Sequence, residues 1–563
     1  MTSHDVLAAA MQNWAEQDPE EGYQRNTLDL LEQLRAGDES AVASADDLFG
    51  KRLAFGTAGI RGPMRAGPNG MNRLVISQTT AGLATHLKHE MGPSNSTHLR
   101  VVIGFDGRHH SETFARDAAE VLSGYGVEAA VLPRMLPTPV LAFAVRELDA
   151  DAGIMITASH NPAEDNGYKV YLGRHDQGSQ IIPPTDSYIE THIRAVADNE
   201  TWSSIPRSPD LVSSVDGDIV QRYLDATKKS LDLAQPYSPG PSIVYTAMHG
   251  VGGETFLAAM DAAGFPAPHV VDAQFTPNPQ FPTVAFPNPE EAGALDLSFE
   301  QARTHEADLI IAHDPDADRL AVALPDSSAS SGYTALTGNQ VGAIFGWHIA
   351  HKARSLEEIG TLANSLVSSP VLGKIARHCG LDHAETLTWF KYVSRVKNLI
   401  FGFEEALGYL VTPDVVRDKD GISAGLLMVS IAHTLASEGR TLWDYLDEIE
   451  AAVGAFASGQ VTIRLAPGTP GSTVTTALRE RKLSAIGSRT VTRHDDFLNG
   501  VGDFPQEDIL RYYLDDATRV IARPSGTEPK VKVYIDTEGA TSSEAQIRLS
   551  EVESDINDLI SSF

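Results

Sequence analysis

The chain has 563 residues, a single cysteine and a formal charge of −31 at pH 7. Its length predicts roughly three to four domains at about 150 residues each, and its composition excludes disorder and coiled coil as the main state. Because non-specific binding to phosphate backbones depends on Lys and Arg, the acidic charge argues against nucleic acid as a partner.

The cellular compartment is predicted from the single cysteine and from the lack of a leader or a long apolar segment. Cys379 alone cannot form an intramolecular disulfide or a cysteine-based zinc site, which favours an intracellular protein. No basic leader followed by an apolar run, and no stretch of about 18 apolar residues, is found. We therefore expect a cytoplasmic protein with no membrane partner, either a monomer or a homodimer.

The first 50 residues are expected to be helical, with Leu28, Leu30, Leu31 and Leu34 on one stripe. A buried strand is then predicted at 99–104, followed by a helix with Ser111 as its N-cap and by a strand at 128–132. The same rhythm of strand and helix returns later in the chain. It recurs at residues 152–156, 242–248 and 308–312. The pattern predicts an α/β fold with buried sheets.

The C-terminal part has a different pattern. Expected strands at 460–465, 519–522 and 531–535 precede an amphipathic helix at 542–563, which together indicate a small α+β domain. Breaks rich in Pro, Ser and Gly divide the chain into four predicted domains. These are residues 1–212, 213–328, 329–456 and 457–563.

The most informative motif is His313-Asp314-Pro315-Asp316-Ala317-Asp318-Arg319, which follows an apolar strand. In an extended backbone, carboxylates two residues apart point the same way, so the three aspartates should converge and need a cation. Oxygen ligands with free coordination sites suit Mg²⁺. An EF-hand is excluded because Arg319 and Pro325 occupy its glycine and glutamate positions. A solvated acidic turn is the alternative.

A second motif is Thr157-Ala158-Ser159-His160-Asn161-Pro162, again after a strand. Ser159 at a strand exit is well placed to be an exposed nucleophile. Adjacent side chains point apart in extended chain, so His160 is not expected to be a direct base for Ser159. The alternative is a turn capped by Ser and Asn.

A third motif, Arg523-Pro524-Ser525-Gly526-Thr527-Glu528-Pro529-Lys530, resembles an anion cradle. It combines a guanidinium, two hydroxyls and a glycine that lets backbone amides approach an anion. The alternative is a polar hairpin turn. Two further segments, 55–62 and 402–409, combine glycine with Arg61 or with Glu404 and Glu405, and are ambiguous in isolation.

Together these five segments closely resemble the α-D-phosphohexomutases, the phosphoglucomutase/phosphomannomutase superfamily, and most of all its long-chain branch, which also contains phosphopentomutases. In that family T-A-S-H-N-P is the phosphoserine loop and D-x-D-x-D-R the Mg²⁺ loop. G-E-x-S-G is the sugar-recognition loop and R-x-S-G-T the phosphate-binding loop. The resemblance implies three similar α/β domains and a smaller C-terminal α+β domain around a central cleft.

The resemblance also implies an activity: exchange of hexose 1-phosphate and hexose 6-phosphate through a phosphoserine and a sugar 1,6-bisphosphate, with glucose or mannose as the sugar. It implies the following roles. Ser159, His160, Lys169 and Arg61 would be catalytic; Ser159, Asp314, Asp316 and Asp318 would bind Mg²⁺; Arg319, Lys391, Glu404 and Glu405 would contact the substrate; and Arg523, Ser525, Gly526, Thr527 and Lys530 would bind phosphate.

The sequence departs from the family pattern at two positions. Ala406 replaces a serine that many relatives have in the sugar loop, and Trp389 stands where T-G-F-K is common. A missing hydroxyl partner alters sugar preference, so a phosphopentomutase acting on ribose or deoxyribose 1-phosphate is the alternative function.

More distant alternatives are a serine hydrolase, a phosphatase and a binding protein without catalytic activity. Gly421-Ile422-Ser423-Ala424-Gly425 matches the hydrolase pattern G-x-S-x-G, but it follows a polar segment rather than a buried strand. Ser423 is instead expected to cap a helix. A sugar-phosphate phosphatase or a sugar-phosphate-binding regulator on the same scaffold also remains open.

Overall fold

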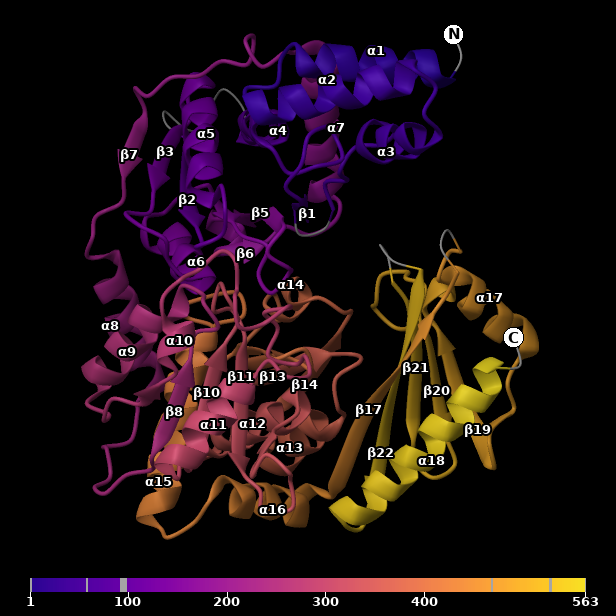
Figure 1. Cartoon of the computed structure of the whole chain (residues 1–563). Coiled ribbons are helices and arrows are strands. Elements are labelled where there is room, and N and C mark those ends of the chain that lie inside the picture. Colours follow the sequence, from indigo (N-terminus) through magenta and orange to yellow (C-terminus); the bar gives the residue numbers. More distant parts are fainter. Residues whose placement is uncertain (1–2, 57–58, 92–98, 467–468, 526–528, 562–563) are drawn as a thin grey trace. The chain divides into compact units, whose positions relative to one another are not determined.

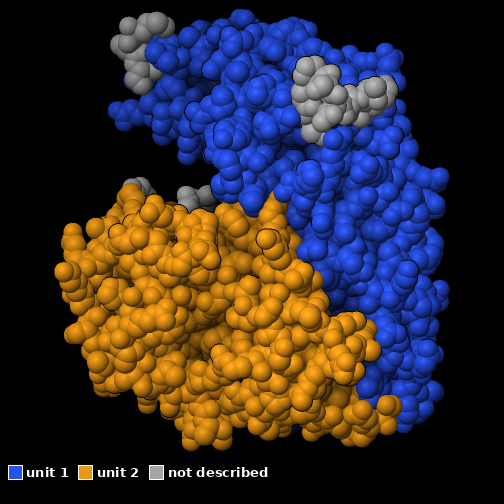
Figure 2. Space-filling model, turned by 180° about the vertical axis from the view of Figure 1, so that it is seen from behind, with its two compact units in different colours: residues 1–335, 408–434 blue, residues 336–407, 435–563 orange. Residues whose placement is uncertain are grey.

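The computed structural model describes residues 3–56, 59–91, 99–466, 469–525 and 529–561. Its contacts divide the chain into two compact units (Figure 2). Unit 1 contains Met1–Ala335 and Gly408–Thr434, and unit 2 contains Leu336–Leu407 and Leu435–Phe563. We call residues 408–434 the return segment, because they belong to unit 1 although they follow a long part of unit 2. No helix in the described part of the chain is long and apolar enough to cross a membrane.

The first sheet of unit 1 has seven strands, in the order β1-β5-β4-β2-β3-β7 with β6 beside β5 (Figure 1). Strands β4, β2, β3 and β7 are parallel, whereas β5 runs antiparallel to both β4 and β1. The strands are β1 (Ile60–Pro63), β2 (Arg100–Phe105), β3 (Glu128–Val131), β4 (Ala152–Ile156), β5 (Asp165–Leu172), β6 (Ser179–Gln180) and β7 (Val212–Ser214). The helices are α4 (Arg73–Met91), α5 (Ser111–Gly124), α6 (Thr138–Glu147) and α7 (Thr185–Asn199), with a 3-10 turn at Arg174–Asp176.

The second sheet of unit 1 has five strands, in the order β12-β11-β10-β8-β9. Strand β10 pairs in parallel with β8 and antiparallel with β11, so the loop that joins β10 to β11 leaves the end of a buried strand. The strands are β8 (Ile243–Thr246), β9 (His269–Val270), β10 (Leu309–His313), β11 (Leu320–Pro325) and β12 (Tyr333–Ala335). The helices are α8 (Ile219–Leu231), α9 (Gly252–Ala263), α10 (Asp272–Phe275) and α11 (Asp296–His305).

The return segment contributes β16 (Gly408–Leu410) and the first part of α15 (Gly421–Ser437). Two buried tyrosines from earlier parts of unit 1 bind it. Tyr171 donates its hydroxyl to Asp418 Oδ2 at 2.9 Å, and Tyr223 donates to the Asp420 carboxylate at 2.9 Å. These hydrogen bonds between buried groups fix the segment in unit 1.

Unit 2 contains a parallel group of strands in the order β14-β13-β15 and a six-stranded antiparallel sheet in the order β17-β22-β21-β20-β19-β18. The first group is β13 (Thr361–Ser365), β14 (Asp382–Thr386) and β15 (Leu399–Glu404), with helices α12 (Gly338–Ser355), α13 (Val371–Cys379), α14 (Phe390–Val393) and α16 (Leu442–Val453). The second is β17 (Ala455–Arg464), β18 (Ala485–Ile486), β19 (Arg489–Asp496), β20 (Leu510–Leu514), β21 (Arg519–Pro524) and β22 (Lys530–Gly539), with α17 (Ser472–Arg481), a 3-10 turn at Phe497–Asn499, and α18 (Ser542–Ser561). The predicted α/β class with a smaller C-terminal α+β part is confirmed.

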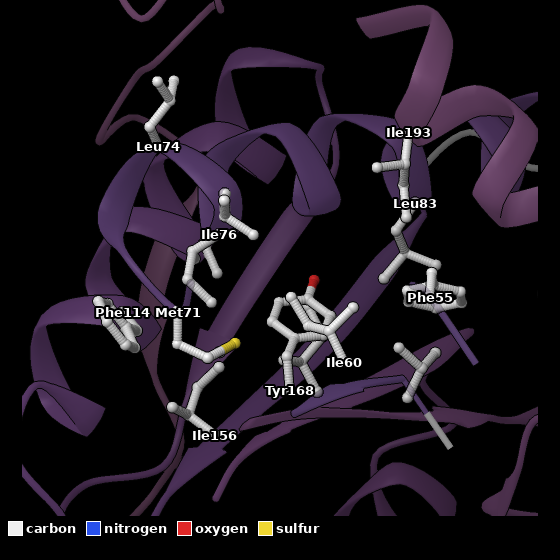
Figure 3. Packing of buried hydrophobic residues seen from close by; sticks show 14 of the residues in the cluster. Phe55, Ile60, Met71, Leu74, Ile76, Leu83, Phe114, Ile156, Tyr168 and Ile193 are labelled. Carbon is white, nitrogen blue, oxygen red and sulfur yellow. The ribbon is translucent and has the colours of Figure 1, made fainter. Parts of the chain in front are cut away.

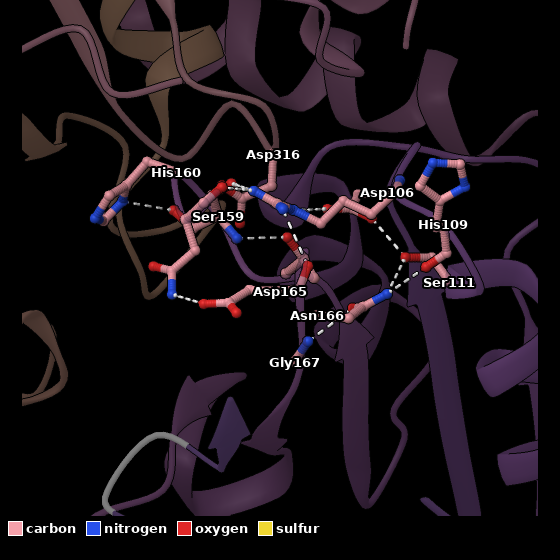
Figure 4. A network of polar contacts seen from close by, with 12 residues as sticks. Asp106, His109, Ser111, Ser159, His160, Asp165, Asn166, Gly167 and Asp316 are labelled. Carbon is pink, nitrogen blue, oxygen red and sulfur yellow. Dashed lines mark hydrogen bonds and ion pairs between the residues drawn. The ribbon is translucent and has the colours of Figure 1, made fainter. Parts of the chain in front are cut away.

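The predicted cap of α5 was wrong in detail. The N-cap is His110, in a left-handed conformation with φ 63°, and Ser111 is the first helical residue. The Ser111 hydroxyl instead donates to Asp106 Oδ1 at 2.7 Å and accepts from Asn166 Nδ2 at 2.9 Å (Figure 4). A serine before an apolar run is a capping signal, but here its hydroxyl joins strands β2 and β5.

The N-terminal helices α1 (Ser3–Ala15), α2 (Glu21–Arg35) and α3 (Glu39–Phe49) belong to the core of the first sheet. Met11 and Leu31 are buried in the same cluster as Ile156 and Tyr168, and Figure 3 shows part of it. Of the predicted leucine stripe, Leu31 and Leu34 are buried, whereas Leu28 is 45% exposed. The first 50 residues therefore complete a hydrophobic core.

Replacing Met11 by Ala should lower the free energy of unfolding of unit 1 by about 2–4 kcal/mol, because a fully buried side chain leaves a cavity. Val6→Ala is the matched control, since Val6 on the same helix is 55% exposed and should cost less than about 0.5 kcal/mol. Urea unfolding measures both. Equal effects from the two substitutions would show that α1 is not part of the core.

Candidate active site

The three aspartates lie on the turn between β10 and β11. All are buried, and their ligand atoms lie within 4.8 Å of one another. The sequence predicted this convergence from an extended backbone, and that reason was wrong. The chain turns after His313, with Ala317 in the left-handed region at φ 54°, and the turn rather than the strand brings the carboxylates together.

Two lysines compensate the charge of this aspartate cluster. Lys169 Nζ, from β5, lies 2.7 Å from Asp316 Oδ2 and 3.0 Å from Asp318 Oδ2. Lys419 Nζ, from the return segment, lies 3.6 Å from Asp318 Oδ2. Burial alone would raise the pKa of Asp318, but Lys169, Lys419 and Arg319 outweigh it and hold this pKa well below its usual range.

Asp314 has the opposite environment. Burial and the neighbouring carboxylates of Asp316 and Asp318 raise the pKa of Asp314 well above its usual range. The three carboxylates are therefore not fully neutralised by the side chains around them. Additional positive charge at this turn would favour the ionised form of Asp314.

Two carboxylate oxygens in the cluster lack a hydrogen-bond partner among the described residues. They are Oδ1 of Asp316 and Oδ1 of Asp318, and both are buried. Asp316 Oδ2, by contrast, accepts a hydrogen bond of 2.6 Å from the hydroxyl of Thr138 at the start of α6. Buried, unsatisfied carboxylate oxygens are costly without a partner, and a hard divalent cation is the partner that oxygen ligands of this kind suit.

Ser159 lies on the loop that connects β4 to β5, and its side chain reaches the aspartate cluster. Its hydroxyl donates to Asp314 Oδ2 at 2.8 Å. His160 Nδ1 lies 3.2 Å from the hydroxyl oxygen of Ser159 (Figure 4). The expectation that His160 points away was wrong, because Ser159 is not extended: its φ of 52° is left-handed and turns the two neighbouring side chains together.

The protonation of the two candidate proton carriers differs. Burial, Arg319 and Arg61 hold the pKa of His160 well below 6.5, so the imidazole is neutral near pH 7. Burial would lower the pKa of Lys169, but Asp316 and Asp318 outweigh it and raise that pKa, so the ammonium stays charged. Neutral His160 is thus the better proton acceptor of the two.

Arg108, three residues after the end of β2, binds the backbone of the Ser159 loop. Its Nη1 donates to the backbone oxygens of Pro162 at 2.7 Å and Asp165 at 3.1 Å. Its Nη2 donates to those of Ser159 at 2.6 Å and Asn161 at 2.5 Å. Sequence reasoning did not assign Arg108 a role. The signal was an arginine within three residues of the end of a buried strand.

Two other predicted residues lie at the edge of this site. Arg61 of β1 donates from Nη1 to Asn161 Oδ1 at 3.0 Å. Arg319 donates its backbone N–H to Asp314 Oδ1 at 3.0 Å, and its guanidinium lies 3.4 Å from Glu290. Both arginines therefore contact a loop that carries Ser159 or the aspartates.

Unit 2 contains the remaining predicted residues, and Glu405 is fixed there by two serines. Its Oε2 accepts hydrogen bonds from the hydroxyls of Ser365 at 3.0 Å and Ser368 at 2.9 Å. Its backbone N–H donates to Ser368 Oγ at 3.1 Å. Glu404, at the end of β15, is the half-buried neighbour.

Arg523 ends β21, next to Glu507, a residue that sequence reasoning missed. Arg523 Nε lies 3.8 Å from Glu507 Oε1 and has no hydrogen-bond partner among the described residues. Burial raises the pKa of Glu507, although Arg523 and Lys391 oppose the rise. The backbone N–H of Ser525 donates to the carbonyl of Lys530 at 2.9 Å, which closes the loop. The predicted residues Gly526 and Thr527 lie outside the described residues.

The rival nucleophile Ser423 is buried within the first turn of α15. The sequence predicted that Ser423 caps this helix, and that prediction was wrong, because Ser423 lies inside the first turn. Asp420 precedes α15 and accepts the Ser423 backbone N–H at 3.0 Å. A fully buried serine inside a helix lacks the exposed strand-to-helix turn of a hydrolase nucleophile.

The chain matches four families that are described as parts of phosphoglucomutase/phosphomannomutase. Alpha/beta/alpha domains I, II and III match residues 52–200, 221–327 and 337–452. The C-terminal domain matches residues 477–554. The matches run in order and together include most of the chain.

Similar proteins carry related names. A Haemophilus influenzae protein named probable phosphomannomutase is 46% identical over 87% of this chain and 98% of its own length. A Homo sapiens phosphopentomutase is 34% identical over 91% of this chain and 89% of its own. The solved structure of a phosphoglucomutase/phosphomannomutase family protein from Burkholderia thailandensis has the same fold, with a TM-score of 0.68 and 19% identity, covering 90% of this chain and 96% of that one.

Replacing Arg108 by Lys should lower the free energy of unfolding of unit 1 by about 2–4 kcal/mol, because one ammonium cannot replace a buried guanidinium that binds four backbone carbonyls. Urea unfolding measures the change. Arg116→Lys is the control: its ion pair with Glu112 is exposed and should be worth less than about 0.5 kcal/mol. If Arg108→Lys were as mild as the control, Arg108 would not hold the loop.

Proposed function

Because the chain belongs to the phosphoglucomutase/phosphomannomutase family of mutase isomerases, we propose that it exchanges hexose 1-phosphate and hexose 6-phosphate through a phosphorylated Ser159 and a sugar 1,6-bisphosphate. Its four domains would be residues 1–212, 213–328, 329–456 and 457–563. The substrate would be a glucose or mannose phosphate.

The observation that carries this proposal is the contact between Ser159 and the aspartate cluster. The hydroxyl lies 2.8 Å from Asp314 Oδ2 and 3.2 Å from the neutral His160 ring. A nucleophile beside a proton acceptor and a concentrated set of carboxylate oxygens suits phosphoryl transfer, in which positioning and charge compensation supply most of the catalysis.

Asp314, Asp316 and Asp318 would hold Mg²⁺, and the two unsatisfied carboxylate oxygens support this assignment. When bound, Mg²⁺ would supply positive charge that offsets the charge on phosphoryl oxygens. Lys169 and Lys419 would add fixed positive charge, since both contact the same aspartates.

Phosphoryl transfer from Ser159 breaks the Oγ–P bond and forms a bond from phosphorus to a sugar oxygen. The sugar hydroxyl loses its proton in this step. His160 would accept that proton and return it to Ser159 Oγ, so that no proton is gained or lost overall. In the reverse direction His160 would take the proton of Ser159 as Oγ bonds to phosphorus, and would give it to the sugar oxygen as the bond from phosphorus to that oxygen breaks.

Recognition of the substrate would fall to unit 2 and to Arg319. Glu404 and Glu405 would accept hydrogen bonds from sugar hydroxyls, and Lys391 would contact the sugar or its phosphate. The phosphate that is not being transferred would bind Arg523, Ser525, Gly526, Thr527 and Lys530. The unpartnered Nε of Arg523 supports this assignment.

A pentose phosphate is the second candidate substrate. A relative that is 34% identical over most of both chains is named phosphopentomutase, and Ala406 removes a hydroxyl from the loop that would contact the sugar. The chemistry at Ser159 would be the same, with ribose or deoxyribose 1-phosphate converted into the 5-phosphate.

Phosphorus NMR tests both substrates. With Mg²⁺ and a trace of hexose 1,6-bisphosphate, the protein should convert glucose, mannose or ribose 1-phosphate into the 6- or 5-phosphate, and the fastest reaction names the sugar. Ser159→Ala should lower the rate by more than about 10³-fold, because the transfer then has no nucleophile.

Ser423→Ala is the matched control and should keep nearly full activity, since Ser423 is buried in α15. Robust turnover by Ser159→Ala would exclude the phosphoserine route. Release of inorganic phosphate without isomerisation would favour a phosphatase, and no reaction would favour a binding protein.

Mg²⁺ should raise the thermal unfolding midpoint of unit 1, because a ligand at about 100 times its Kd stabilises the folded state by roughly 2.7 kcal/mol. Asp316→Asn should abolish the shift by removing a ligand charge. Asp210→Asn, an exposed aspartate of the same unit, should leave it intact. A scan with chelator and then with Mg²⁺ measures each. An undiminished shift in Asp316→Asn would place the metal elsewhere.

A further inference from the structure

Trp389 has an unusual backbone conformation for a tryptophan. It precedes α14 with φ 91° and ψ 127°, in the region that favours glycine. A side chain with a Cβ is strained there, and such strain persists only where the surroundings impose it. The position is also where the sequence departs from the T-G-F-K pattern common in the family.

Burial does not compensate for this strain. The indole of Trp389 is 49% exposed, although its neighbour Phe390 is buried. A half-exposed aromatic ring on a strained backbone gains little from packing. Strain of this kind clusters at functional sites, so a contact made by the exposed ring is the place to look for its role.

The indole lies against Arg523. The guanidinium carbon of Arg523 is 5.7 Å from the centroid of the Trp389 ring, within cation–π range. Carboxylate pairing of this arginine is weak, since Glu507 lies 3.8 Å from Nε and burial raises the pKa of Glu507. Nε itself is buried and has no hydrogen-bond partner within the described ranges.

We propose that Trp389 is a positioning residue that orients Arg523 toward the phosphate group of a sugar phosphate. A carboxylate would occupy the N–H donors of the arginine and neutralise it. An aromatic face holds the guanidinium plane through its π electrons and leaves the unpartnered Nε–H for an anion, although the guanidinium also shares a hydrogen bond with Tyr534. The strained tryptophan thus fixes the orientation of Arg523.

This inference rests on the proposed role of Arg523 in phosphate binding, and it predicts opposite effects on binding and stability. Trp389→Gly should raise the unfolding midpoint of unit 2 by about 1–3 °C, because glycine relieves the positive φ. The same substitution should raise the Kd of inorganic phosphate by about 5- to 20-fold. A purely structural residue would not gain stability while losing affinity.

Calorimetric titration of the full chain with inorganic phosphate, and kinetics with glucose 1-phosphate, measure the effect in a double-mutant cycle. The variants are Trp389→Gly, Trp389→Phe, Arg523→Met and the Gly/Met double variant. Trp389→Phe should stay within about threefold of the parent. In the Arg523→Met background, Trp389→Gly should change Kd by less than about twofold, and KM should rise more than kcat falls in Trp389→Gly alone.

Glu357→Gly is the matched control, because Glu357 is an exposed residue of unit 2 at φ 55°. It should relieve strain without changing phosphate affinity. Unchanged affinity in Trp389→Gly, or an equal loss with and without Arg523, would overturn the inference while the phosphate site stands. Unchanged affinity in Arg523→Met would instead remove the phosphate site of the proposed function, and the role of Trp389 with it.

Discussion

Mutual repulsion among three buried carboxylates is the constraint on which the rest of unit 1 depends. The ligand atoms of these carboxylates lie within 4.8 Å of one another, and carboxylates so close in a buried turn repel when ionised unless positive charge lies beside them. Lys169 reaches the turn from one sheet, and Lys419 reaches it from the return segment. Burial and the neighbouring carboxylates still raise the pKa of Asp314, so positive charge added at this turn would favour its ionised form.

The loops of the candidate site are held mainly by buried polar groups rather than by apolar packing. Arg108 binds four carbonyls of the Ser159 loop, and two serines bind the carboxylate of Glu405. Each of these bonds joins a residue at or near the end of a strand to a segment that carries a candidate site residue. Such hydrogen bonds restrict the conformations that these loops can adopt.

The sequence predicted the fold class because strand-like apolar runs alternate with helical periods, and 152–156 matches β4 residue for residue. Motif residues also predicted the approach of the three aspartates. The sequence could not predict the left-handed backbone at Ser159 and Ala317, since neither residue is a glycine. Because an extended backbone was assumed at Ser159, the side chain of His160 was predicted to point away from that serine. Lys419 and Arg108 were missed because their partners lie far away in sequence, and only the tertiary structure brings them together.

The return segment has a consequence for the order in which the chain is made. Unit 1 is interrupted by 72 residues of unit 2, from Leu336 to Leu407, before Asp418, Lys419 and Asp420 complete it. On the ribosome, the aspartate turn is therefore synthesised long before Lys419 can approach it. Tyr171 and Tyr223 are likewise synthesised long before Asp418 and Asp420, which accept their hydrogen bonds. A nascent chain must hold an incompletely compensated acidic turn until about three-quarters of the protein has been synthesised.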